Sequence, residues 1–277
     1  MKKQRKYAKP ILYTILIIYA LITLYPFLWA VSASFKTFKE ITGGGASIIP
    51  KNFTFDNYIN LFTGTAKYTK WFFNSVFIAV TGTLLNIILN SMAGYSLAQI
   101  EFKGSKAFFS LLIATLTIPG QVLMIPNYLI IKALGFMNTF SAIIIPSAIN
   151  VTYIFLMRQY FMSFSKQVEE AARIDGVSRA GCFFRIALPL SRSIIATQAT
   201  FIFLGFWNDF TKAMLYLKDV NKFTLPLGIQ ATQSQSSGFT MWNETLTFSV
   251  VSMIPILIMY IVLNKYFMQG LRMEGEK

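Results

Sequence analysis

The most distinctive spacing of residues in the chain lies between positions 169 and 189. Glu169-Glu170-Ala171-Ala172-Arg173-Ile174-Asp175-Gly176 is followed, after nine further residues, by Ile186-Ala187-Leu188-Pro189. Acidic side chains in the first turn of a short helix favour its dipole, and the small alanines let another protein approach closely. Gly176 permits a sharp turn, and Pro189 can begin the next helix because its missing N–H is harmless there. The pattern favours a docking surface for a partner protein; the alternative is an ordinary amphipathic helix at a membrane surface.

The rest of the sequence offers little chemistry for an enzyme. It contains no histidine and a single cysteine, Cys182, which excludes a His-ligated zinc site, a Ser-His triad and an internal disulfide. The phosphate-binding pattern Gly-x-x-x-x-Gly-Lys-Ser/Thr does not occur. We therefore predict that the chain is not an enzyme and holds no catalytic, cofactor-binding or metal site of its own.

The composition indicates an integral membrane protein. Apolar residues make up 55% of the 277, the mean hydropathy is +0.54, and only 13% of the residues are charged. A soluble domain has about a quarter of its residues charged. The formal net charge of +14 would suggest nucleic acid in a soluble protein, but here the basic residues lie between apolar runs, where they face lipid headgroups. Membrane lipid is therefore the expected surrounding, and nucleic acid is not an expected partner.

Six uncharged runs are candidates to cross the bilayer, and together they predict an all-α, polytopic membrane helical bundle with six transmembrane helices. A crossing needs about 20 residues. A signal peptide is the alternative for the first run, but its apolar stretch is longer than the usual signal core of about 7–15 residues. The runs are Ile11–Ala33, Trp71–Ala98, Ala107–Ile131, Ala142–Met157, Ser193–Trp207 and Thr245–Leu263.

Loop charge sets the expected orientation. If the N-terminus is cytoplasmic, the inner segments hold most of the 25 Lys and Arg residues, every arginine among them. Positive charge favours the cytoplasmic side of short loops. Both termini and the segment 164–189 are therefore predicted to lie on the cytoplasmic side of the cell membrane.

The second run carries a stripe of small and amide residues. Gly82, Asn86, Asn90 and Gly94 repeat every four residues and so share one side of a helix. Such a face points toward other helices and not toward lipid. Two interpretations remain open: the stripe lines a translocation path for a solute, or it packs in the bundle interior with amide hydrogen bonds across helices.

Prolines interrupt several of the apolar runs, as is common in transporters. None of the runs contains a charged residue in its middle. Helix breaks at membrane depth are tolerated where they face protein or a water-filled cavity. Ion-coupled transporters usually need buried acidic or histidine side chains. An ion-coupled secondary transporter acting alone is therefore the less favoured alternative. The interrupting prolines are Pro26, Pro119, Pro126, Pro146 and Pro255.

The docking pattern resembles the EAA loop of ABC importer permeases in both residue type and spacing. Other segments are similar to permeases of the carbohydrate-importing, maltose-type branch, and the resemblance covers essentially the whole chain as the shorter, six-span partner of a permease pair. These segments are Asn74-Ser75, Ala93–Ala98, Met124–Lys132, Leu134-Gly135, Asn138-Thr139, Phe206–Phe210 and Lys265–Leu271.

The resemblance implies a type I ABC importer permease fold that translocates a sugar or oligosaccharide. It implies four kinds of partner: a second permease subunit, two copies of a cytoplasmic ABC ATPase that uses ATP and Mg, an extracytoplasmic solute-binding protein and a carbohydrate substrate. Residues 169–172, 175, 176, 186, 188 and 189 would couple to the ATPase. The expected division is a cytoplasmic tail 1–10, a first helix 11–33, an outer loop 34–70, a five-helix core 71–267 with the coupling loop 164–189, and a cytoplasmic tail 268–277.

Overall fold

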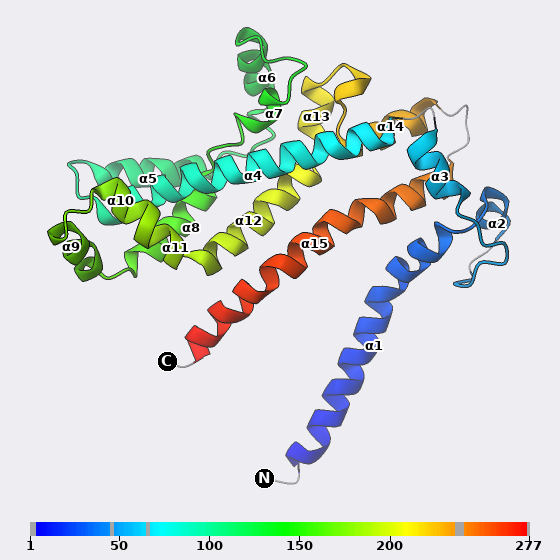
Figure 1. The fold of residues 1–277 in the computed structure, drawn as a ribbon, viewed down its shortest axis with the longest axis horizontal. Helices are drawn as coiled ribbons and strands as arrows, with labels where there is room; N and C mark the ends of the chain where they lie inside the picture. The colour runs from blue at the N-terminus through cyan, green and yellow to red at the C-terminus, as the bar shows by residue number, and fades with distance from the viewer. Residues whose placement is uncertain (1–3, 45–46, 65–66, 236–240, 276–277) are drawn as a thin grey trace. The chain divides into compact units, whose positions relative to one another are not determined.

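The computed structural model describes residues 4–44, 47–64, 67–235 and 241–275, and these residues form helices and connecting turns without a β-strand. Figure 1 shows these helices along the chain. The chain divides into two compact units. Unit 1 contains residues 1–69 and 229–255, and unit 2 contains residues 70–228 and 256–277.

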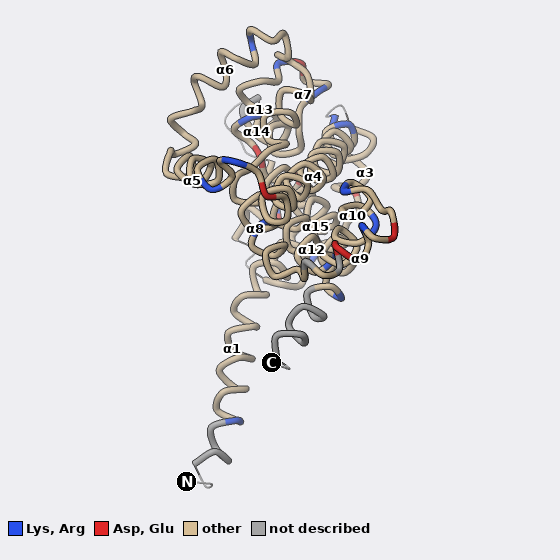
Figure 2. Tube along the Cα trace, turned by 90° about the vertical axis from the view of Figure 1, so that its left-hand side faces the viewer, with Lys and Arg blue, Asp and Glu red and all other residues tan. Residues whose placement is uncertain are grey.

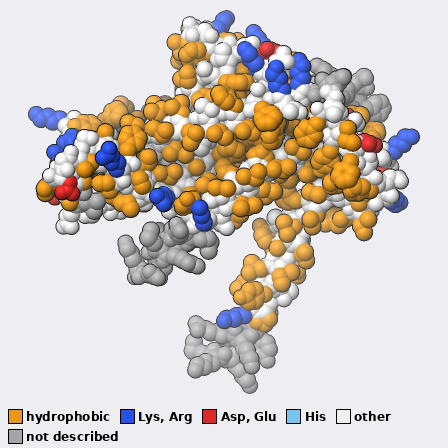
Figure 3. All heavy atoms as spheres, in the orientation of Figure 1, with side chains coloured by type: hydrophobic (Ala, Val, Ile, Leu, Met, Phe, Trp, Pro, Cys, Tyr) orange, Lys and Arg blue, Asp and Glu red, His pale blue; other side chains and the backbone are white. Residues whose placement is uncertain are grey.

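Among the residues that the structure describes, three helices are long and apolar enough to cross a membrane by themselves. They are α1 (Gln4–Ala33), α4 (Tyr68–Gln99) and α15 (Trp242–Gly275). The 30 residues of α1 span about 45 Å at 1.5 Å per residue. Beyond Lys9, α1 carries no charged residue, and its side chains are apolar over most of its length (Figures 2 and 3). Its exposed Tyr19 and Ile22, each 68% accessible, need lipid or a partner subunit to cover them.

Shorter helices make up most of the chain between α4 and α15. Within the described residues, a pair of helices separated by a bend of 81°, Arg179–Leu190 and Arg192–Trp207, forms a further candidate crossing. The shorter helices are α5 (Ser105–Thr115), α6 (Met124–Ala133), α7 (Ser141–Ile144), α8 (Val151–Met162), α9 (Lys166–Ile174), α10 (Arg179–Cys182), α11 (Leu188–Leu190), α12 (Arg192–Trp207), α13 (Thr211–Tyr216) and α14 (Leu225–Gln235).

Two of the expected runs contain breaks. The run 107–131 is helical in α5 and α6, and a series of turns at 116–123 with Pro119 separates them. The run 142–157 is broken at 145–150, next to Pro146, and Asn150 caps the start of α8 by accepting a hydrogen bond from the Thr152 N–H at 2.9 Å. Proline cannot donate to a helical ladder, so each break lies where the ladder loses a donor.

The other three prolines do not break their helices. Pro126 lies in the first turn of α6, where no donor is needed. Pro26 and Pro255 lie inside α1 and α15, which continue through them. A proline in an apolar run therefore did not by itself determine where these helices end.

Unit 1 is held by a buried polar cluster after α1. The Asn57 amide in α3 (Asp56–Thr63) donates to the carbonyls of Ser34 and Lys36 at 2.9 and 2.8 Å. The Asn243 amide donates to Asn57 Oδ1 at 2.8 Å. Lys36 is fully buried, although it belongs to the expected outer loop, and its ammonium donates to the Ser47 carbonyl.

The loop after the short helix α2 (Phe38–Thr42) is closed by an acidic side chain. The Glu40 carboxylate accepts from the backbone N–H groups of Lys51 and Asn52 at 2.8 and 3.1 Å. These hydrogen bonds, chiefly that of Lys51, hold the pKa of Glu40 below its usual value. The carboxylate is therefore a fixed part of this loop in its charged form.

Unit 2 packs its helices closely around α4. α8 lies against α5 and α12. A Cβ at Gly94 of α4 would come within 2.6 Å of Met157 Cβ in α8, and a Cβ at Gly82 would come within 2.5 Å of the Phe206 ring in α12. Both glycines therefore allow α4 to approach its neighbours at distances that a larger residue would prevent.

Candidate functional site

The segment with the distinctive spacing forms a short helix, a tight turn and a second helical stretch. α9 ends at Ile174, and Gly176 follows in the left-handed region with φ of +81°. The Val177 N–H donates to the Ala172 carbonyl at 2.9 Å, and the Gly176 N–H donates to the Arg173 carbonyl at 3.1 Å. These two bonds close a Schellman motif. The structure thus places Gly176 in the turn that its position in the sequence predicts.

The two alanines of α9 differ in burial. Ala172 is 8% accessible and packs against its own chain, whereas Ala171 is exposed. The expectation that both alanines lower the outer surface was therefore wrong for Ala172, because this alanine is buried within the chain itself. Ile174 is 86% accessible, so an apolar side chain stands free beside the exposed Asp175 and Gly176.

Charged side chains surround a hollow of about 200 Å³ beside α9. Glu169 is half-buried there, and Glu170 is exposed. Two basic side chains of α9 and α10 complete a surface of mixed charge, which is suited to ion pairs with a partner protein. The hollow is lined by Gln99, Glu101, Glu169, Glu170, Arg173 and Arg179.

The C-terminal half of the motif is anchored inside unit 2. Leu188 packs against a buried cluster in which Tyr95 of α4 meets Phe161 of α8 and Phe183, with ring centroids 5.4 and 5.3 Å apart. Ala187 is 1% accessible within this cluster, and Ile186 lies beside it in a π-helical turn, residues 183–187. One end of the motif is thus exposed, and the other is packed among helices.

We expected Pro189 to begin the long apolar helix, but it does not. It lies in α11, which continues the π-helical turn, and the chain then bends by 81° at the buried Ser191 before α12 begins. A proline that removes one ladder bond permits a widened turn before it and a bend after it. The Ser191 hydroxyl donates to the Leu188 carbonyl at 2.9 Å and so satisfies part of the opened backbone.

The stripe on α4 faces other helices of unit 2. Asn90 is fully buried, and its amide donates to the Asn86 and Ala148 carbonyls at 2.7 and 3.2 Å. Its Oδ1 accepts from the Asn150 N–H at 2.9 Å. Asn90 therefore ties α4 to the break between α7 and α8, as an amide in a bundle interior does. Gly82 and Gly94 are close-packing positions on the same side.

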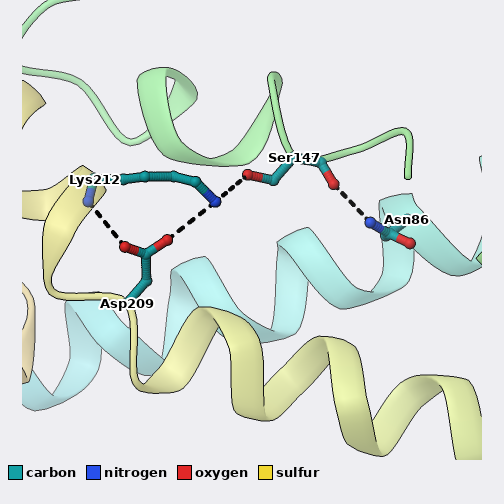
Figure 4. A network of polar contacts seen from close by, with 4 residues as sticks. All are labelled: Asn86, Ser147, Asp209 and Lys212. Carbon is teal, nitrogen blue, oxygen red and sulfur yellow. Dashed lines mark hydrogen bonds and ion pairs between the residues drawn. The ribbon is translucent and has the colours of Figure 1, made fainter. Parts of the chain in front are cut away.

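Asn86 additionally borders a cleft of about 130 Å³ in unit 2. Its amide donates to the Ser147 carbonyl at 2.6 Å. The Lys212 ammonium donates to the Ser147 hydroxyl at 2.9 Å and pairs with Asp209 at 3.0 Å, so four residues form one polar chain (Figure 4). The cleft is lined by Asn86, Ser147, Asn150, Tyr153, Phe201, Ile202, Gly205, Phe206 and Lys212.

Residues 90–273 match the family model of the binding-protein-dependent transport system inner membrane component. The chain belongs to this family. It is accordingly a multi-pass membrane transport component and not an enzyme.

Similar proteins cover nearly the whole chain. The arabinooligosaccharides transport system permease protein AraQ of Halalkalibacterium halodurans is 36% identical over 93% of this chain and 92% of the relative. The polygalacturonan/rhamnogalacturonan transport system permease protein YtcP of Bacillus subtilis is 33% identical over 94% of each chain. A chain of a bacterial ABC transporter involved in import of the acidic polysaccharide alginate has a TM-score of 0.85 at 26% identity, covering 95% of this chain and 97% of its own. The all-α permease fold of an ABC importer is therefore established for this transport component.

The residues that the sequence did not single out are those brought together across long separations. Ser147 and Lys212 lie 65 positions apart, and neither has a local pattern that marks it. Asn150 lies inside the run 142–157 but had a usable signal, because asparagine is a preferred N-cap and the stretch after it is apolar. Tyr95 lay in a segment noted only for its resemblance to the family, and no local signal revealed its aromatic cluster.

Proposed function

We propose that this chain is the permease subunit through which an ATP-driven bacterial importer carries a sugar or oligosaccharide across the cell membrane. The carbohydrate is delivered by an extracytoplasmic solute-binding protein. ATP, with Mg²⁺, is hydrolysed in two copies of a separate cytoplasmic ATPase, and a second permease subunit completes the path. The support is a match to sugar-transport permeases over more than nine-tenths of the chain.

The exposed half of the motif is the proposed ATPase contact. Glu169, Glu170, Ala171, Asp175 and Gly176 would meet the ATPase directly. Ala172 would support α9 from behind, since it is buried. The exposed Ile174 would add an apolar anchor, a kind of residue that contributes strongly to binding when a partner covers it.

The packed half of the motif is proposed to transmit movement. Ile186, Leu188 and Pro189 join α9 and α10 to α12 through the π-helical turn and the bend at Ser191. A displacement of α9 by the ATPase would therefore reach α4 and α8 through the aromatic cluster around Tyr95. The stripe residues Gly82, Asn90 and Gly94 are proposed to belong to the bundle interior, and Asn86 to both the interior and the cleft wall.

Cross-linking tests the ATPase contact directly. In a chain with Cys182→Ala, Ile174→Cys places one exposed thiol beside the turn. In the complete importer this thiol should cross-link to the ATPase subunit, whereas Lys218→Cys, an exposed position in the expected outer region, should not. Absence of any cross-link from position 174 to the ATPase, in an importer that transports normally, would contradict the proposed contact.

A further inference from the structure

The cleft in unit 2 presents hydrogen-bonding groups that the chain itself does not use. The side-chain N–H₂ of Asn150 and the hydroxyl of Tyr153 have no hydrogen bond to any described residue, although Asn150 Oδ1 caps α8. The Lys212 ammonium has three N–H donors and directs two of them to Ser147 and Asp209. Its third donor is available to a ligand in the cleft.

Aromatic rings stand next to these polar groups. Phe201 lines the cleft and is 60% accessible, and Tyr153 supplies a second ring from α8. A sugar ring has an apolar C–H face and a rim of hydroxyl groups. A site with exposed rings and a few placed donors and acceptors matches both of these surfaces.

The volume of the cleft and the charge of its wall limit the kind of ligand that it can bind. The cleft, at about 130 Å³, is smaller than the roughly 300–1,000 Å³ of a pocket for a drug-sized molecule. It therefore suits one small ring and not a whole oligosaccharide. Lys212 and Asp209 balance each other at 3.0 Å, so the wall carries little net charge and favours uncharged hydroxyl groups.

A buried polar side chain lies in α12, the helix that also supplies Phe201. Gln198 is fully buried in α12, and neither its amide oxygen nor its nitrogen has a hydrogen-bond partner among the described residues. It shares a face of α12 with Ile202 and Gly205, both of which line the cleft, because these positions are spaced by about one helical turn. A buried amide without partners is rare and needs an explanation.

We propose that this cleft is a sugar-contact site on the present chain. Phe201 and Tyr153 stack on one sugar ring, while Asn150, Lys212 and the Tyr153 hydroxyl bind its hydroxyl groups. Gln198 is the next polar contact as the ring advances along α12. This inference rests on the proposed function, because it names the place where this permease would touch its carbohydrate.

Removal of the Tyr153 hydroxyl tests the sugar contact in the complete importer. Proteoliposomes with the solute-binding protein are given a panel of labelled trisaccharides, neutral and uronate-bearing. For a neutral sugar that the wild type transports, Tyr153→Phe should raise KM about 2- to 10-fold, the value of one hydrogen bond, with kcat unchanged. Tyr19→Phe, the same change on the exposed surface of α1, should leave KM unaltered. An unchanged KM for Tyr153→Phe would overturn the site.

Thiol labelling supplies a second readout. In the Cys182→Ala background, Phe201→Cys should react with a water-soluble methanethiosulfonate reagent, and the transported trisaccharide should slow this reaction during turnover. A thiol that never reacts would show that Phe201 faces lipid or another subunit, and labelling unaffected by sugar would also overturn the inference. Failure of the wild type to transport any carbohydrate would count against the proposed function, whereas a wild type that transports while Tyr153→Phe keeps its KM overturns this inference alone.

Discussion

Gly176 carries the turn on which the coupling proposal depends. Its φ of +81° costs a residue with a Cβ roughly 1–2 kcal/mol, but nothing lies within 4 Å of an added Cβ. We expect Gly176→Leu to give a folded, membrane-inserted protein with little or no uptake, since the turn shifts and moves α9 away from the ATPase. Sugar uptake and the amount of copurified ATPase are the measurements.

Asparagine provides the matched control at this position. Asn tolerates the left-handed conformation better than other residues with a Cβ. Gly176→Asn should therefore retain much of the uptake that Gly176→Leu loses. Normal uptake by Gly176→Leu would contradict the coupling role, and loss of the protein from the membrane would show a folding role instead.

Asn90 is the buried amide with the most partners on α4. Asn90→Leu leaves the Ala148 carbonyl and the Asn150 N–H without this partner, at a cost of roughly 1–3 kcal/mol for each group left unsatisfied. We expect lower thermal stability in detergent and reduced assembly. Leu84→Ile, on an exposed part of the same helix, should have little effect. Equal melting temperatures for the two variants would contradict the interior role of Asn90.

Local features of these residues could be predicted from the sequence, and their long-range contacts could not. The turn at Gly176 and the four-residue spacing on α4 follow from neighbouring positions alone. The inward side of Ala172 depends on what packs behind α9. The burial of Lys36 and the chain Asn86–Ser147–Lys212–Asp209 depend on segments that meet only after folding.

At the scale of elements, the contact between α4 and α8 depends on a missing side chain. A Cβ at Gly94 would lie 2.6 Å from Met157 Cβ and 2.8 Å from the Arg158 backbone nitrogen. Because backbone cannot move aside easily, Gly94→Ala should cost about 1–3 kcal/mol. Gly120→Ala, with nothing within 4 Å of the new Cβ, is the matched control. Gly94→Ala alone should lower the temperature of unfolding in detergent. An equal decrease for both variants would contradict close packing at Gly94.

The elements also show where a hydropathy pattern stops being informative. Runs such as 107–131 and 142–157 are apolar throughout, yet turns interrupt both. The prolines marked candidate breaks, but Pro26 and Pro255 lie in continuous helices while Pro119 and Pro146 lie at breaks. Tertiary hydrogen bonds, such as that from the Asn86 amide to the Ser147 carbonyl, stabilise a break at one proline where another helix stays continuous. No short window of sequence contains both partners of such a bond.

For the whole molecule, orientation in the membrane is the next prediction. Because every arginine falls in segments assigned to the inside, both termini and residues 164–189 should be cytoplasmic. A reporter that is active only in the cytoplasm, fused after Lys277, should be active. A fusion within the loop at residues 51–55 should be inactive. The reverse pattern would contradict the orientation and, with it, the placement of α9 beside a cytoplasmic ATPase.

The central claim is that this chain carries sugar with energy from a separate ATPase. Its most direct test is uptake of labelled oligosaccharide into proteoliposomes that contain this chain, the second permease, the ATPase and the solute-binding protein. Accumulation should require enclosed ATP and all four proteins, and an ion gradient should not replace ATP. Accumulation driven by an ion gradient with this chain alone would contradict the account and identify a secondary transporter instead.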